Sequence, residues 1–149
     1  MKPSALYDFV WHVGQDVIYI YVLCPGHTME VFIMLSILKE KVLENGVSWA
    51  MKSSKLMNYQ LELAIKYHKQ AQQYPIKNWY SVGEPRKELI EKRNHYLNQL
   101  LIELQKWGIG LNIPLLRPWQ EKCDDIFSAA LEFFKCEHIA IEHGLYRVG

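Results

Sequence analysis

Residues 85–108 read PRKELIEKRNHYLNQLLIELQKWG, and this amphipathic stretch decides the fold. A proline in the first turn and a glycine at the end are typical of the two ends of a helix. Apolar side chains recur at spacings of three and four residues, which predicts one buried stripe on that helix. The stripe comprises Leu89, Ile90, Leu97, Leu100, Leu101, Leu104 and Trp107.

The same helical period dominates the rest of the chain, and no clean two-residue strand period recurs. We expect five helices, over residues 4–23, 28–44, 48–73, 85–108 and 118–143. The run Val17–Val22 is β-branched and aromatic and is also compatible with a strand, but it lacks a partner strand of equal quality. The sequence therefore predicts an all-α fold: a single-domain antiparallel helical bundle over residues 1–149.

Composition excludes several protein classes. The chain has 149 residues, 50% of them hydrophobic, and a net charge of +1, which excludes a disordered protein. Its three cysteines, Cys24, Cys123 and Cys136, form no CxxC pair, so we expect reduced, buried thiols rather than disulfides or a zinc ribbon. Acidic residues interrupt the N-terminal region at Asp8 and Asp16, which argues against a signal peptide. A cytoplasmic location is expected.

One apolar stretch, residues 17–38, carries a single charged residue, Glu30. Pro25 and Gly26 divide it into two runs, and each is shorter than the roughly 20 residues that a membrane-spanning helix needs. A buried helical hairpin is therefore favoured over a membrane segment.

Two pairs of acidic residues raise the question of a metal site. Glu88 with Glu91, and Glu121 with Asp124, are similar to the ExxE and ExxD pairs of all-α nucleotide pyrophosphatases, whose carboxylates hold Mg²⁺. If the last two helices are antiparallel, their N-termini lie roughly 30 Å apart. We therefore expect these residues to complement helix dipoles instead.

A second set combines histidine with carboxylates: Asp8, His12 and Asp16 at spacings of four, and His138 with Glu142. Convergence of such ligands in a bundle would resemble a di-iron site, but the full pairing of Glu with ExxH is absent, which favours a solvated surface. The sequence contains no GxSxG, no Cys–His signature and no P-loop. It predicts neither catalysis nor a cofactor.

The charge distribution is the strongest functional signal. Residues 1–49 carry a net charge of −2, residues 50–93 carry +5, and residues 94–149 carry −2. The central segment interleaves its basic residues with Tyr59, Tyr67, Tyr74, Trp79 and Tyr80. Lysine and arginine neutralise phosphates and exposed aromatic rings stack on bases, although lysines on a helix are also common as a merely solvated face.

These features predict a non-catalytic binding subunit of a larger assembly that contacts a nucleic-acid phosphate backbone. The expected phosphate contacts are Lys52, Lys55, Lys66, Lys69, Arg86 and Lys87, with Trp79 and Tyr80 stacking on bases. Trp79, Arg117 and Trp119 are further candidates for binding hot spots. Two alternatives remain open: an adaptor that binds an acidic protein surface through the same face or a spare apolar face, and a metal-dependent helical enzyme.

Overall fold

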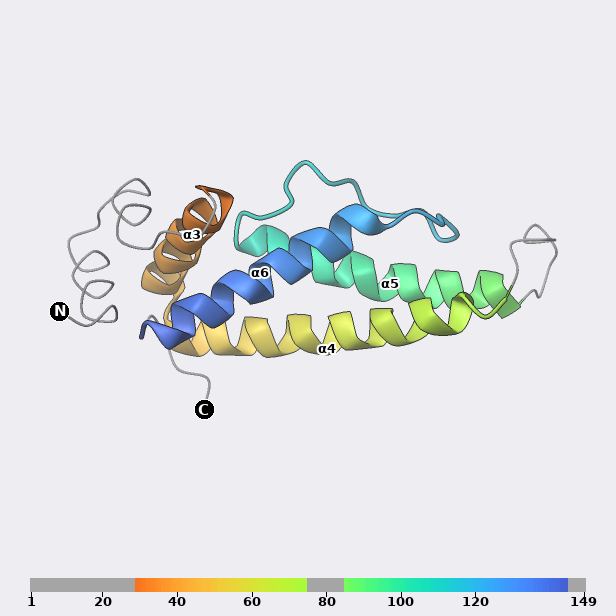
Figure 1. Cartoon of the computed structure of the whole chain (residues 1–149), viewed down its shortest axis with the longest axis horizontal. Helices are drawn as coiled ribbons and strands as arrows, with labels where there is room; N and C mark the ends of the chain where they lie inside the picture. The colour runs from red at the N-terminus through yellow and green to blue at the C-terminus, as the bar shows by residue number, and fades with distance from the viewer. Residues whose placement is uncertain (1–28, 75–84, 145–149) are drawn as a thin grey trace. The chain divides into compact units, whose positions relative to one another are not determined.

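The computed structural model describes residues 29–74 and 85–144 (Figure 1). Their regular structure is entirely helical, and no strand occurs within these ranges, which confirms the all-α class for this part of the chain. The helices are α3 (Met29–Asn45), α4 (Val47–Ala71), α5 (Pro85–Lys106) and α6 (Asp124–Glu142). The helix expected over residues 4–23, including the ambiguous run 17–22, lies outside the described residues. The count of five helices therefore stays a prediction.

The chain divides into two compact units. Among the described residues, one comprises 29–52 and 131–144, and the other comprises 53–74 and 85–130. Helices α4 and α6 contribute residues to both units. The expectation of one domain over residues 1–149 stays a prediction, and each unit is described by itself.

The first unit contains α3, the start of α4 and the second half of α6. Its buried apolar residues include Val31, Phe32, Leu35, Leu38, Val42, Phe133, Cys136, Ile139 and Ala140. Helix α3 ends at Asn45, close to the expected end, because Gly46 adopts a φ of 95° that other residues rarely reach. The N–H of Gly46 donates to Val42 O at 2.8 Å, and its carbonyl accepts from the N–H of Ala50, within the first turn of α4.

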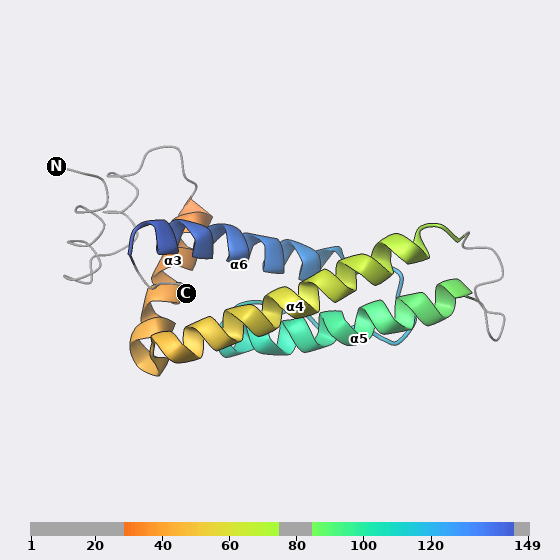
Figure 2. The ribbon, with the colours of Figure 1, turned by 90° about the horizontal axis from the view of Figure 1, so that it is seen from below.

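In the second unit, α4 and α5 run side by side in opposite directions (Figures 1 and 2). Two contacts fix this register. Near the start of α4, Ser53 Oγ donates to Glu103 Oε1 near the end of α5, at 2.9 Å. Towards the other end of α4, the Tyr67 ring stacks on Tyr96. The antiparallel arrangement predicted for these two helices is therefore confirmed.

The stripe on α5 forms the core of this unit. Six of its seven predicted members are buried, and Leu89 is half-buried. Gly108, with a φ of 79°, stops the helix as expected. Its N–H donates to Gln105 O at 2.9 Å and that of Ile109 to Leu104 O at 3.2 Å, which is the hydrogen-bond pattern of a Schellman C-cap.

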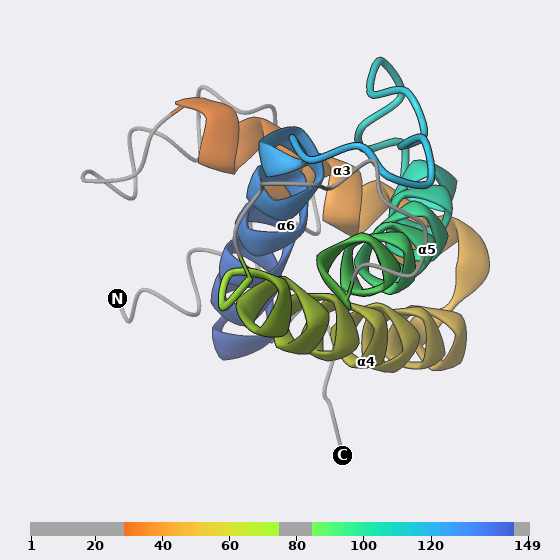
Figure 3. The same ribbon diagram turned by 90° about the vertical axis from the view of Figure 1, so that its right-hand side faces the viewer.

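The start predicted for the last helix is wrong. Helix α6 begins at Asp124 rather than at Pro118, and residues 109–123 form a long loop on the side of α5 that faces away from α4 (Figures 1 and 3). Side chains of α5 hold this loop by its backbone. Asn98 binds both the N–H and the carbonyl of Leu116, at 2.7 and 2.9 Å. Asn94 Nδ2 donates to the carbonyls of Arg117, Pro118 and Gln120. These bonds hold the backbone of residues 116–120 in the loop, and α6 begins only after them.

None of the four described helices combines the length and the apolar content needed to cross a bilayer. Cys123 and Cys136 are buried and form no disulfide, as predicted, whereas Cys24 lies outside the described residues. Burial raises the pKa of the Cys123 thiol. Burial, together with the nearby Glu132 carboxylate, raises the pKa of Cys136 to about 12. Both thiols are therefore protonated and unreactive at neutral pH.

Candidate nucleic-acid interface

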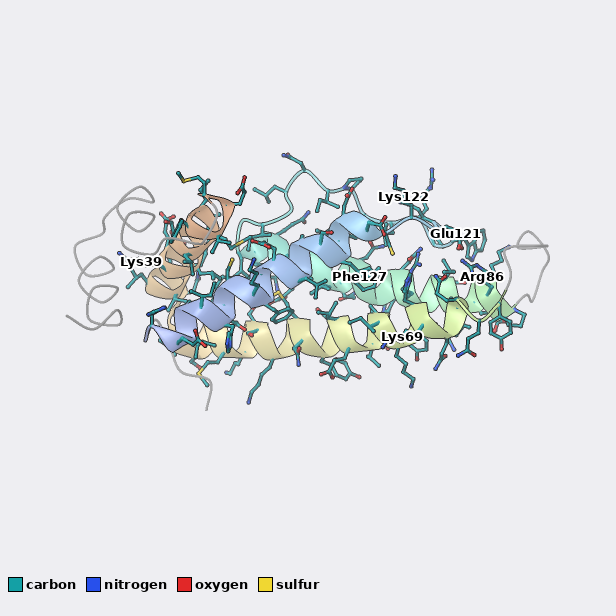
Figure 4. All side chains as sticks on the ribbon, viewed as in Figure 1. Lys39, Lys69, Arg86, Glu121, Lys122 and Phe127 are labelled. Atoms are coloured by element: carbon teal, nitrogen blue, oxygen red, sulfur yellow. The ribbon has the colours of Figure 1, made fainter. Side chains whose placement is uncertain are left out.

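The exposed face of α4 carries most of the predicted basic residues. The helix contains four lysines and one glutamate, a net charge of +3. Lys55, Lys66 and Lys69 are exposed and lie in the second unit (Lys69 is labelled in Figure 4). We call these three residues the lysine row. Eleven residues make about three helical turns, so Lys55 and Lys66 share a face, and the row spans about 21 Å. Lys52 is also exposed, but it belongs to the other unit.

Two side chains lie between the ends of the lysine row on the same face of α4. Tyr59 is 57% exposed, and it is one helical turn beyond Lys55. Glu62 is exposed and accepts a hydrogen bond from Asn58 Nδ2 at 3.3 Å. The row is therefore accessible to a ligand along its length, with one carboxylate among its lysines.

Arg86 does not belong to the exposed set, because its side chain is buried (6% exposed). Its Nε donates to both carboxylate oxygens of Glu121, at 3.1 and 3.2 Å, and the two side chains meet in Figure 4. Its Nη1 donates to the carbonyls of Ala71 and Tyr74. These bonds tie the end of α4 and the long loop to the start of α5. Arg86 therefore has a structural role and is not an exposed contact for a phosphate.

Lys87, which is half-buried, forms a small cluster with the exposed residues Trp119 and Glu91. The Lys87 ammonium lies 3.9 Å from the centroid of the Trp119 ring. The indole Nε1 donates to Glu91 Oε2 at 3.2 Å, and Trp119 remains 43% exposed. The indole face therefore already holds a cation, which makes Lys87 a weaker candidate for a phosphate contact than the lysine row.

An aromatic hollow beside the lysine row escaped the sequence analysis. It measures about 460 Å³ and lies between α4 and α5, where it is lined by Tyr67, Glu88, Glu91, Lys92, His95 and Tyr96. The rings of Tyr67 and Tyr96 are parallel within 7°, with centroids 6.0 Å apart. Tyr67 was noted among the basic residues, but Tyr96 and His95 fall just outside the positive segment. Tyr96 could be recognised as the partner of Tyr67 only once the register between α4 and α5 is known, and the sequence alone does not give that register.

The acidic pairs lie closer together than expected. The long loop returns along α5, so Glu121 reaches Arg86 in the first turn of that helix, and the predicted separation of roughly 30 Å is wrong. Within residues 29–74 and 85–144, however, no three histidine, cysteine or acidic side chains are placed to hold a metal ion. His138 Nε2 and Glu142 form an exposed surface pair at 2.9 Å. Asp8, His12 and Asp16 lie outside the described residues.

A buried polar network joins α5 to α4 and to the long loop. Arg93, 1% exposed, donates from Nη2 to the carbonyls of Gln120 and Glu121, at 2.7 and 2.9 Å. Its Nη1 lies 3.2 Å from Nδ1 of His68. Since Arg93 has donors only, His68 Nδ1 must be the acceptor, and the ring is neutral with its proton on Nε2.

We expect His68 to make the protein less stable in acid. Burial, and then the positive charges of Arg93 and Arg86, lower the pKa of His68 below its usual 6.5, against smaller opposing effects of Asp124 and Glu121. As the pH falls below about 6.5, His68 therefore binds a proton more readily in the unfolded chain than in the folded chain. The stabilisation is complete above about pH 6.5 and is lost as pH falls from there towards the folded pKa.

Urea denaturation at pH 7.5 and 5.5 measures this effect. The variant His68→Gln keeps an acceptor for Arg93 but does not titrate, so its midpoint should fall less between the two pH values. His95→Gln, at an exposed histidine, is the control and should behave like the parent chain. An equal acid loss in His68→Gln and the parent would contradict this role of His68.

Trp79 and Tyr80, the predicted stacking residues, lie outside the described residues, so their place relative to the lysine row stays a prediction. Arg117, proposed as a hot spot, is exposed in the long loop next to Trp119. In comparisons with known proteins, no family model, curated protein or solved structure matches the chain. Its function is therefore inferred from its own side chains.

Proposed function

We propose that the chain is a non-catalytic binding subunit of a larger assembly, and that it contacts a nucleic-acid phosphate backbone through the exposed face of α4. The observation that carries the proposal is the lysine row, three exposed lysines over about 21 Å of one helix, with Glu62 the single acidic residue of α4. Ammonium groups at such positions displace counterions from phosphates, which is the main source of sequence-independent affinity. Lys87 is a peripheral contact, and the predicted contact at Lys52, which belongs to the other unit, stays a separate prediction.

The proposal predicts salt-dependent binding that the lysine row controls. Fluorescence anisotropy with short single- and double-stranded RNA and DNA, at about 50 and 200 mM salt, should show binding that weakens as salt rises. Each phosphate contact on a single strand contributes about 0.7 to the slope of log affinity against log salt concentration. Reversing two charges, in the variant Lys66→Glu/Lys69→Glu, should weaken binding and flatten this slope by about 1.4.

The matched control reverses two other exposed lysines, so that its net charge equals that of Lys66→Glu/Lys69→Glu. The variant Lys122→Glu/Lys135→Glu changes the loop and α6 instead of the lysine row. It should keep most of the slope if α4 makes the contacts. Equal losses in both variants would indicate general charge attraction, and no binding of any oligonucleotide at low salt would overturn the proposal.

A second candidate function is a protein adaptor on the same face. The observation that favours it is the pair of exposed apolar side chains among the lysines, Leu56 and Tyr59. Aromatic and aliphatic side chains of this kind form the centres of protein interfaces. Under this function, the purified complex contains an acidic protein and no nucleic acid, and Leu56→Ser weakens that complex.

A further inference from the structure

We infer that the aromatic hollow between α4 and α5 takes up an unpaired nucleobase, so that the chain prefers single-stranded to double-stranded nucleic acid. This inference rests on the proposed function and assigns the base-binding part of the same surface. The hollow lies in the second unit and adjoins the lysine row, because the ammonium group of Lys66 lies 5.6 Å from the centroid of the Tyr67 ring.

The rings that line the hollow hold one another in place. Tyr67 and Tyr96 are parallel, and the His95 ring meets Tyr96 edge-on, at 5.2 Å and 75°. Both tyrosines are half-buried, so part of each ring still faces solvent. A rigid aromatic wall accepts a flat ligand at a small entropic cost, and every base offers a face to stack.

Two ammonium groups lie over the Tyr67 ring, which leaves Tyr96 as the ring on which a base stacks. The ammonium groups of Lys66 and Lys92 lie 5.6 and 5.7 Å from the centroid of the Tyr67 ring. A base stacked in the hollow therefore has two ammonium groups within reach of its flanking phosphates. Stacking surfaces next to a positively charged track are the usual construction of single-strand binding sites.

The carboxylates in the hollow decide which part of a ligand enters it. Glu88 and Glu91 are exposed there and repel a phosphate, a lipid headgroup or an acidic peptide. A neutral base is not repelled, and its amino groups are donors that a carboxylate accepts, as glutamate does from the N4 amino group of cytosine. Glu91 already accepts from Trp119, which leaves Glu88 as the better-placed acceptor.

A base can enter the hollow only when it is out of a duplex. In a double helix the base faces are covered by their neighbours, and exposing one requires unstacking and unpairing. The lysine row by itself binds the phosphates of either form. The preference for single strands is therefore the property that the hollow adds.

The test compares three ligands on the full chain by fluorescence anisotropy: a short cytosine-rich single strand, its duplex, and the same strand with abasic sites. The abasic strand has the same phosphates but no bases at those positions. We expect it to bind about tenfold more weakly than the parent strand, with an unchanged salt slope. The duplex should also bind more weakly than the single strand.

Substitutions in the hollow test whether the weaker binding of the abasic strand arises there. Tyr96→Leu should reproduce the tenfold loss, whereas Tyr96→Phe keeps the ring and should bind like the parent. Phe134→Leu, at a half-buried aromatic ring of α6 outside both the hollow and the lysine row, is the matched control. If Tyr96→Leu fails to fold, the abasic comparison on the parent chain still decides.

Equal binding of abasic and parent strands, with a normal salt slope, would overturn the base site and leave the lysine row intact. Equal affinities of Tyr96→Leu and Tyr96→Phe would overturn it in the same way. Absence of binding to all three ligands would overturn the proposed function itself.

Discussion

Replacing Arg93 with methionine should lower the free energy of unfolding by about 3 kcal/mol. Methionine fills much of the space of the arginine stem but donates no hydrogen bonds. The carbonyl of Glu121 and Nδ1 of His68 then lose a partner that the structure provides, at 2.9 and 3.2 Å. Each buried acceptor left unpaired costs about 1–3 kcal/mol, and removing the buried charge offsets part of the sum.

Urea denaturation followed by circular dichroism measures this change. Arg117→Met, at an exposed arginine in the same loop, is the control and should stay within about 0.5 kcal/mol of the parent. Arg93→Lys keeps the charge but cannot point donors at two carbonyls and a histidine at once, so it should be nearly as unstable as Arg93→Met. Equal midpoints for Arg93→Met and Arg117→Met would show that the network does not hold the loop.

The sequence predicted those helix ends that local residues determine. Gly46 and Gly108 require unusual backbone angles, and Pro85 fits only the first turn of a helix, so α3 and α5 end or begin close to where the sequence predicted. These signals act within a few residues along the chain. They therefore do not depend on which helices pack together.

The start of α6 depends on distant residues and was missed for that reason. Apolar side chains from Trp119 to Phe134 recur at helical spacing, yet Asn94 and Asn98 bind the backbone of residues 116–120 and hold it in the loop. An asparagine in a polar position of α5 gives no sign of its partner. The path of the loop, and with it the contact between Arg86 and Glu121, depends on the same contacts from α5 and could not be predicted either.

The candidate site was predicted in part for the same reason. Lys55, Lys66 and Lys69 share one helical face, and spacing alone places them together. Arg86 has the same charge, but its burial depends on the loop that reaches it from 35 residues away. The hollow depends on Tyr67 facing Tyr96, which only the register between α4 and α5 determines.

Trp107→Ala should destabilise the protein by about 3–5 kcal/mol, the largest effect expected of a single core substitution here. Trp107 is fully buried at the end of α5, and its removal leaves a cavity that surrounding side chains fill only partly. Trp119→Ala is the matched control. Its indole is 43% exposed, so the expected cost is below about 1 kcal/mol.

A smaller substitution separates the hydrogen bond of Trp107 from its packing. The indole Nε1 donates to Ser53 Oγ at 2.8 Å, and Ser53 donates in turn to Glu103. Trp107→Phe removes that bond but keeps an aromatic ring, and Ser53→Ala removes the same bond from the other side. Ser53→Ala also removes the bond to Glu103. Because the two variants share the loss of the bond between Trp107 and Ser53, their effects in the double variant should be less than additive, by about 0.5–1.5 kcal/mol. Additive losses would show that the bond between α4 and α5 contributes no stability beyond the packing of the two side chains.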